Sequence, residues 1–122
     1  MPNSFVLKVE AGEDVIQKIV ELMGKEKTTE IVFTKATGKL RDPEIVTHGK
    51  QGSVNTEKLK GDYEINAISG SIERKKETIN HQINVAVTQT GVNAKIGKLI
   101  KAKAGRELEI GLRRIDLSKM IM

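Results

Sequence analysis

The chain has 122 residues, with 21 Lys and Arg against 16 Asp and Glu, two histidines and no cysteine. A chain of this length buries roughly two-thirds of its unfolded surface, so we expect residues 1–122 to form a single domain. The missing cysteine excludes disulfides and thiolate metal sites. No apolar run approaches the ~20 residues that span a bilayer and no signal-peptide core is present, so we expect a cytoplasmic protein without a membrane partner.

Positive charge is concentrated near the C-terminus. Residues 1–90 hold 13 basic and 13 acidic side chains, whereas residues 91–122 hold eight basic and three acidic ones. Such an excess can mark a surface for phosphate or another anion. It is equally typical of a solvated face whose lysines keep the protein soluble and discourage edge pairing.

The N-terminal part predicts a strand followed by a helix. Alternation favours a strand over Ser4–Val9. Apolar side chains then recur at helical spacing and Gly24 is a suitable stop, which predicts a helix over residues 13–24. Glu13 and Asp14 would lie in its first turn, where the helix dipole favours acidic groups.

The next segment predicts further strands. Glu30–Ala36 is rich in β-branched residues and Glu44–Thr47 is a short strand candidate. Pro43 cannot donate a ladder hydrogen bond, so it belongs at a turn or a strand edge. Residues 48–61 are polar and glycine-containing and leave room for one edge strand.

The second half predicts four strands separated by glycine or charged turns. They are Tyr63–Ile72, Ile79–Val87, Ala94–Ala104 and Arg106–Arg114. The order of one strand, one helix and then many strands indicates an α+β domain with an antiparallel or mixed sheet on which the helix packs. Strict strand–helix alternation is missing, which argues against a doubly wound fold.

Four segments in this order resemble the PPC (plants and prokaryotes conserved) domain, in its stand-alone prokaryotic form. The segments are Leu7–Val15 (LKVEAGEDV), Phe33–Pro43 (FTKATGKLRDP), Glu64–Ile72 (EINAISGSI) and Glu107–Leu112 (ELEIGL). The third is the most specific, because it resembles the family's Glu-Ile-x-x-x-Ser-Gly strand. The resemblance implies an α+β subunit that assembles as a homotrimer.

The resemblance also carries an association with DNA. In plants the domain accompanies an AT-hook, a short Arg-Gly-Arg-Pro-type motif that binds the minor groove, and prokaryotic members are named DNA-binding by analogy. This chain contains no such motif, since Arg41-Asp42-Pro43 is not one. The DNA association therefore comes from the fold family and not from residues of this chain.

Many prokaryotic members carry a His-x-His pair on one strand and Gly-Gly-His on the next, which implies a metal site. The strand pattern places Asn80 and Gln82 at the first motif and Ile96-Gly97-Lys98 at the second. Carboxamides are poor zinc ligands and an ammonium is none. If the alignment to the His-x-His motif is shifted by one residue, His81 is the only histidine that enters the motif. We therefore expect no metal and no cofactor.

Alternation along residues 79–87 separates two faces. Ile83 and its apolar neighbours form a core face that also holds His81, which we expect to be partly buried and hydrogen-bonded. The other face holds amides, including Asn80 and Gln82. It suits a subunit interface, a small pocket or a plain solvent face.

Alternation along residues 94–104 puts Lys98 in an apolar row. The other members of that row are Ala94, Ile96, Ile100, Ala102 and Ala104. Burying an unpaired charge is costly, so Lys98 needs an explanation. Either a bulge at Gly97 turns it outward, or it pairs with a carboxylate such as Glu64, or it binds an anion beside Asn80 and Gln82.

No catalytic motif is present: there is no cysteine nucleophile, no G-x-S-x-G, no P-loop and no G-x-G-x-x-G. We therefore expect a non-catalytic module that associates with itself as a homotrimer, with a vestigial pocket around Asn80, Gln82 and Lys98. A DNA-binding protein is the alternative. Its candidate phosphate contacts are Lys95, Lys101, Lys103, Arg106 and Arg113. A small-anion or metabolite binder with Lys98 as the cation is the third hypothesis.

Overall fold

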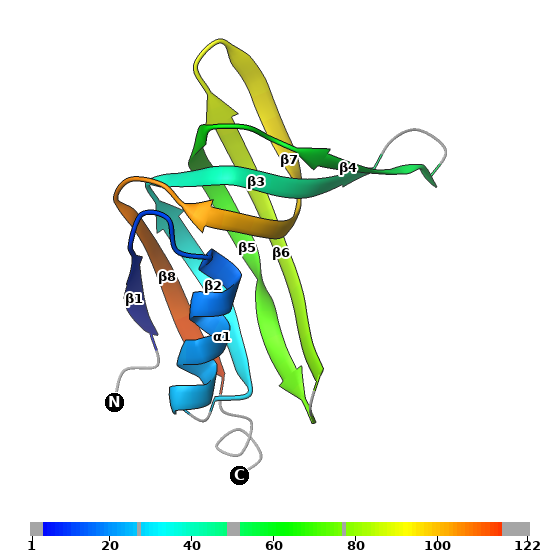
Figure 1. The fold of residues 1–122 in the computed structure, drawn as a ribbon. Helices are drawn as coiled ribbons and strands as arrows, with labels where there is room; N and C mark the ends of the chain where they lie inside the picture. The colour runs from blue at the N-terminus through cyan, green and yellow to red at the C-terminus, as the bar shows by residue number, and fades with distance from the viewer. Residues whose placement is uncertain (1–3, 27, 49–51, 77, 116–122) are drawn as a thin grey trace.

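The computed structural model describes residues 4–26, 28–48, 52–76 and 78–115. The elements are β1 (Ser4–Val9), α1 (Val15–Glu26), β2 (Glu30–Thr37), β3 (Lys39–His48), β4 (Val54–Lys58), β5 (Asp62–Lys75), β6 (Thr78–Gln89), β7 (Val92–Ala104) and β8 (Leu108–Ile115). This order confirms the predicted α+β class (Figure 1). Within the described residues, no helix is long and apolar enough to cross a membrane.

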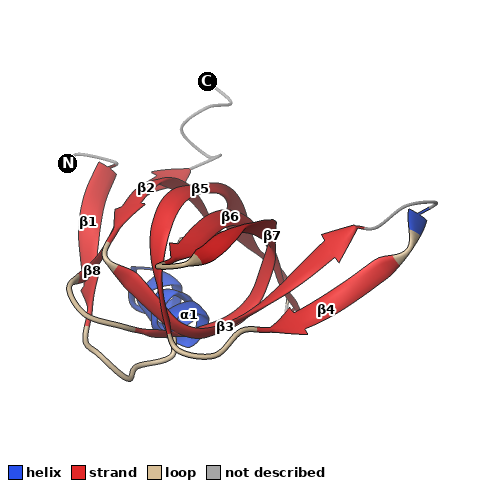
Figure 2. Ribbon diagram, turned by 90° about the horizontal axis from the view of Figure 1, so that it is seen from above, coloured by secondary structure: helices blue, strands red, loops and turns tan. Residues whose placement is uncertain are grey.

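The described strands form one eight-stranded sheet in the order β1-β8-β2-β5-β6-β7-β3-β4. Strand β3 also pairs with β5, so that β3, β5, β6 and β7 close on themselves, as the view from above shows (Figure 2). All these pairings are antiparallel. The β3–β4 hairpin extends away from the rest of the molecule (Figure 2).

Helix α1 covers the inner face of β8 and β2 (Figure 1). Its buried side chains, Val15, Ile19 and Met23, recur every four residues and form one apolar stripe. The stripe belongs to one hydrophobic cluster with side chains of the sheet, among them Ile31, Phe33, Ile72, Ile110 and Leu112. Each large side chain buried in this way stabilises the fold by about 1.5–3 kcal/mol.

The helix begins at Val15, two residues later than predicted, because Asp14 caps it instead of joining its first turn. The Asp14 carboxylate accepts a hydrogen bond from the Gln17 backbone N–H at 2.9 Å. Glu13 precedes the cap and accepts a hydrogen bond from the Lys18 ammonium at 3.1 Å. This bond, with a second one from the Glu10 backbone N–H, lowers the pKa of Glu13.

Strand β3 is longer than the predicted Glu44–Thr47 and contains Pro43 as a buried residue. The pairing register with β7 shifts between Arg41 and Glu44, and Asp42 has a positive φ of 50°. Pro43 therefore lies at an irregularity, where its missing N–H breaks no ladder bond. Strand β4 is the edge strand expected within residues 48–61.

The predicted core face of residues 94–104 is wrong for the first half of β7. Ile96 is 71% exposed and Ile100 37% exposed, whereas Leu99 is buried. Ile45 pairs with Leu99 while Glu44 pairs with Lys101, so Ile100 is an extra residue in β7. An extra residue transfers the following side chains to the other face, which is why Ala102 and Ala104 are buried.

The inner face of β6 carries His81 beyond the buried Ile83, as predicted. His81 pairs in register with the buried Ile72 of β5 and is half-buried. Its Nδ1 is buried and, within the described residues, has no hydrogen-bond partner, so the expected hydrogen bond is not made at this atom. Burial lowers the pKa of His81, and the nearby charge of Lys98 lowers it further.

We predict that Gly70→Ala destabilises the protein strongly. Gly70 has a φ of +111°, and an added Cβ would lie 1.8 Å from the Gln82 carbonyl oxygen on β6. Backbone strain and this clash together should lower the free energy of unfolding by about 3 kcal/mol or more. Gly91→Ala is the matched control: its φ is +79°, but nothing lies within 4 Å, so the loss should be about 1–2 kcal/mol. Urea denaturation measures both, and equal losses would contradict the prediction.

A second prediction concerns pH. Because the folded protein binds a proton at His81 less readily than the unfolded chain, this residue's contribution to stability is complete above pH 6.5 and falls as the pH drops from 6.5 toward the lowered pKa. His81→Gln should flatten that part of the stability curve. Denaturation midpoints across this range measure the slope; an unchanged slope in the variant would exclude His81 as its source.

Candidate functional site

A row of uncharged polar side chains lies on the outer side of β5 and β6, opposite the helix-covered core. Asn80, Gln82 and Asn84 are exposed along β6. Their register partners on β5 include Ser71 for Gln82 and Ser69 for Asn84. Partners opposite each other in an antiparallel pair project to the same side. We call these five residues, together with Lys98, the amide face.

Lys98 is exposed and lies opposite Asn84 in the β6–β7 register. It does not pair with Glu64, which lies opposite Thr88. Thr88 is four residues beyond Asn84 along β6, about 13 Å at strand spacing. Lys98 therefore faces outward, as the first alternative expected, but the register shift lies at Ile100 and not at Gly97.

The amide face does not suit a transition metal. Its side chains offer carboxamide oxygens, hydroxyls and one ammonium, which compete poorly with imidazole and thiolate for such ions. His81 projects from the opposite face of β6. Within the described residues, no group of three or more His, Cys, Asp or Glu side chains is arranged to hold a metal ion.

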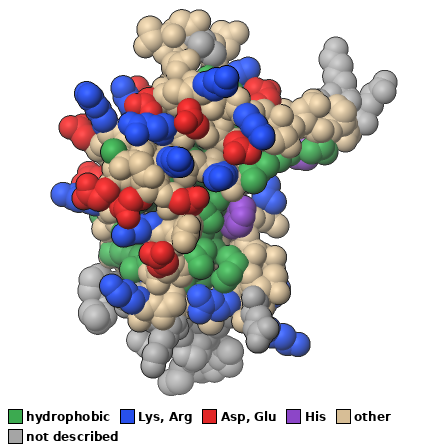
Figure 3. Space-filling model, in the orientation of Figure 1, with side chains coloured by type: hydrophobic (Ala, Val, Ile, Leu, Met, Phe, Trp, Pro, Cys, Tyr) green, Lys and Arg blue, Asp and Glu red, His purple; other side chains and the backbone are tan. Residues whose placement is uncertain are grey.

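The basic residues of the C-terminal quarter do not form one patch. Lys95 makes an ion pair with Glu57 at 3.5 Å. Lys101 and Lys103 are exposed on β7, whereas Arg106 lies in the turn before β8 and Arg113 on β8 opposite Val32. The space-filling view shows Lys and Arg interspersed with Asp and Glu over the upper part of the visible face (Figure 3).

Sequence reasoning missed a groove between two turns. One turn joins β2 to β3 at Gly38, and the other joins β7 to β8 through Gly105 and Arg106. A cavity of about 680 Å³ lies on one side of them, lined among others by Lys8, Glu10, Thr37, Glu107 and Glu109. A second hollow of about 420 Å³ shares Gly38, Arg106 and Glu107 with it and is also lined by Lys39 and Glu64. We call the two hollows together the turn groove.

Backbone contacts interlock the two turns. The Lys39 N–H donates to the Arg106 carbonyl at 3.2 Å, and the Gly105 N–H donates to the Lys39 carbonyl at 2.8 Å. A Cβ added to Gly38 would lie 2.3 Å from the Glu107 carbonyl oxygen, so only glycine fits. The sequence gives no sign of this contact, because it joins parts of the chain that are distant in sequence.

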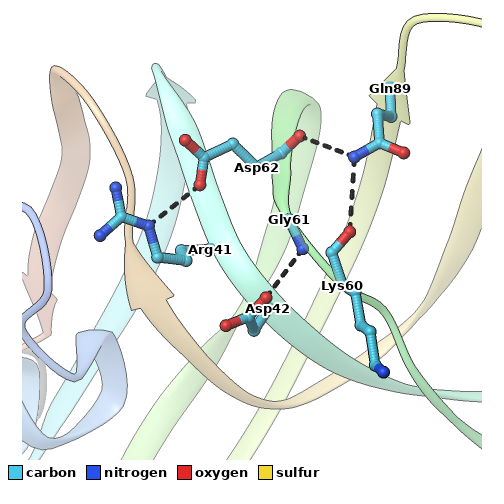
Figure 4. Close-up of polar contacts among 6 residues, drawn as sticks. All are labelled: Arg41, Asp42, Lys60, Gly61, Asp62 and Gln89. Carbon is cyan, nitrogen blue, oxygen red and sulfur yellow. Dashed lines mark hydrogen bonds and ion pairs between the residues drawn. The ribbon is translucent and has the colours of Figure 1, made fainter.

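A polar cluster lies where β3, β5 and β6 meet (Figure 4). Arg41 of β3 contacts the Asp62 carboxylate of β5 at 3.1 Å. The Asp42 carboxylate accepts a bond from the Gly61 N–H at 2.8 Å. Gln89 of β6 donates to the carbonyl oxygens of Lys60 at 3.4 Å and Asp62 at 3.3 Å. These contacts join β3, β5 and β6 where the strands close.

The fold has counterparts among solved structures. A plant- and prokaryote-conserved protein from Pyrococcus horikoshii has a TM-score of 0.79 and 20% identity over 93% of this chain and 78% of its own. A metal-containing protein from Archaeoglobus fulgidus has a TM-score of 0.77 and 20% identity, with 91% and 78% covered. A candidate DNA-binding protein from Ralstonia eutropha has a TM-score of 0.79 and 15% identity, with 94% and 80% covered.

At these identities the likeness shows the fold alone, and a comparison with curated proteins finds no match. The family is shown by the sequence itself, since the model of the Plants and Prokaryotes Conserved domain matches residues 1–116. The match confirms the resemblance carried by Glu64–Ile72 and the other three segments. The chain belongs to the Plants and Prokaryotes Conserved domain family.

Proposed function

We propose that the protein is a non-catalytic module that assembles as a homotrimer through the amide face and the adjoining free edge of β6. The observation that carries this proposal is an open strand edge beside exposed apolar side chains. Pairing of β6 with β7 begins at Asn84. Within the described part of the chain, residues 78–83 therefore pair with β5 on one edge and with no strand on the other edge.

This edge lacks the usual protection against pairing. Residues 78–83 (TINHQI) contain no Lys, Arg, Asp, Glu or Pro, the residues that ordinarily keep an edge strand from pairing with another chain. On the neighbouring β7, Ile96, which lies opposite Ala86, is 71% exposed and Ile100 is 37% exposed. An uncharged open edge on a sheet that also exposes isoleucines is typical of a surface covered by another subunit.

The projecting β3–β4 hairpin supplies a second, different patch. It extends away from the body, β4 is the last strand of the sheet, and Val54 at its start is 59% exposed (Figures 1 and 2). A ring of three subunits needs two unlike patches on each copy, because cyclic contacts beyond the dimer are head-to-tail. The hairpin of one copy and the β6 edge of the next meet this requirement.

We predict that Ile96→Lys converts the trimer to a monomer. Wild type should have three times the 13.5 kDa monomer mass by light scattering after size exclusion at about 100 µM. The lysine should dissociate it, because burying an unpaired charge at a subunit contact is costly. Gln17→Lys, on the exposed side of α1, is the control and should leave the mass unchanged. A monomeric wild type would refute the proposal.

DNA binding is a second candidate function, favoured by one observation. Lys101 and Lys103 alternate along β7 so that both ammonium groups are exposed on the same side, and neither makes an ion pair within the described part of the chain. Similar proteins from Ralstonia eutropha and Bacteroides thetaiotaomicron are named as candidate DNA-binding proteins. Three copies would present three such pairs to the phosphate backbone.

For this candidate we predict a steep salt dependence. About six phosphate contacts per trimer should weaken binding to a duplex about a thousandfold between about 50 and 200 mM salt. Lys101→Gln with Lys103→Gln should abolish most of this dependence. Lys25→Gln with Lys75→Gln removes the same charge from α1 and β5 and should not. Fluorescence anisotropy measures all three proteins, and no binding by wild type at low salt would exclude DNA as the ligand.

A further inference from the structure

Four charged side chains line the smaller hollow of the turn groove, and none of them forms an ion pair with another described residue. Lys39 and Arg106 are basic, and Glu64 and Glu107 are acidic. The described residues form five ion pairs elsewhere, and none includes these four. Two positive and two negative groups thus line one hollow of about 420 Å³, with Lys39 opposite Glu64 in the β3–β5 register.

The backbone holds these charges in place. Arg106 and Glu107 lie in one turn and Lys39 follows the other, and the two turns are bonded through the Lys39 N–H and the Lys39 carbonyl. Glu107 has a φ of 54°, a left-handed conformation that is costly for a residue other than glycine. Strain of this kind persists where the surrounding structure fixes it, and it concentrates at ligand sites.

We propose that the turn groove binds a small zwitterion, a molecule with one carboxylate and one ammonium such as an amino acid or a short peptide. Arg106 and Lys39 bind the carboxylate, and Glu64 and Glu107 bind the ammonium. A ligand with only negative charge would meet two carboxylates, and one with only positive charge would meet two cations. A hollow of about 420 Å³ lies within the size range of small-molecule sites.

This inference does not rest on the proposed trimer. The turn groove and the amide face share no residue. Glu64 belongs to the same strand as Ser69 and Ser71 but lies at its other end, opposite Thr88. Failure of one proposal would therefore leave the other standing.

The test is a titration of the full chain, labelled with ¹⁵N, with three zwitterions whose charges lie at increasing separation: glycine, 4-aminobutyrate and glycylglycine. We expect at least one to cause saturable shifts of the Gly38, Lys39, Arg106 and Glu107 amide signals below about 20 mM. Acetate and methylammonium, at matched ionic strength, should bind at least about fivefold more weakly. Absence of saturable shifts with all three zwitterions, or equal binding of acetate or methylammonium, would overturn the proposal.

Single substitutions distinguish binding in the turn groove from a general effect of the protein's charge. Arg106→Gln and Glu64→Gln should each weaken zwitterion binding about fivefold, since each removes one charge partner. Both side chains are exposed, so the amide spectrum should show an intact fold. Lys25→Gln removes an exposed charge of α1 outside the groove and should leave binding unchanged. An effect of Lys25→Gln as large as that of Arg106→Gln would refute the assignment.

Discussion

The pairing of β3 with both β5 and β7 is the constraint on which the rest of the structure depends. Strand β3 joins β7 along one edge and β5 along the other, which closes β5, β6 and β7 into a ring. A regular strand could not turn sharply enough to do this, and the ladder is irregular at Pro43 and at Ile100. The contacts of Arg41 with Asp62 and of Asp42 with Gly61 hold the closed end together.

Closure of the ring also creates the surface that is proposed to contact another subunit. Because β7 leaves β6 after Lys98 to follow β3, residues 78–83 of β6 keep an open edge, and Ile96 and Ile100 of β7 remain exposed. Strand β7 therefore closes the ring within one subunit and leaves one edge of β6 open, where another subunit is proposed to pair. Buried apolar area at that edge would add to the stability of an assembled protein in proportion to the area covered.

The turn groove arises from the same closure at the other end of the ring. Strand β3 starts beside the end of β7, and this brings the Gly38 turn against the turn that precedes β8. The close approach requires glycine at position 38 and fixes Glu107 in a left-handed conformation. The charges of Lys39, Glu64 and Arg106 are exposed, so they contribute little to the stability of the fold.

The sequence by itself determined the class of fold, the helix, most strands and the family, because periodicity, glycine turns and short motifs such as Glu64–Ile72 are local properties. It also indicated the outward row of Asn80 and Gln82, which follows from alternation alone. Only the tertiary structure decided the faces of β7, the length of β3 around Pro43 and the existence of the turn groove. The physical reason is that a bulge is set by the partner strand and a groove by turns distant in sequence, and neither leaves a periodic signal in the chain.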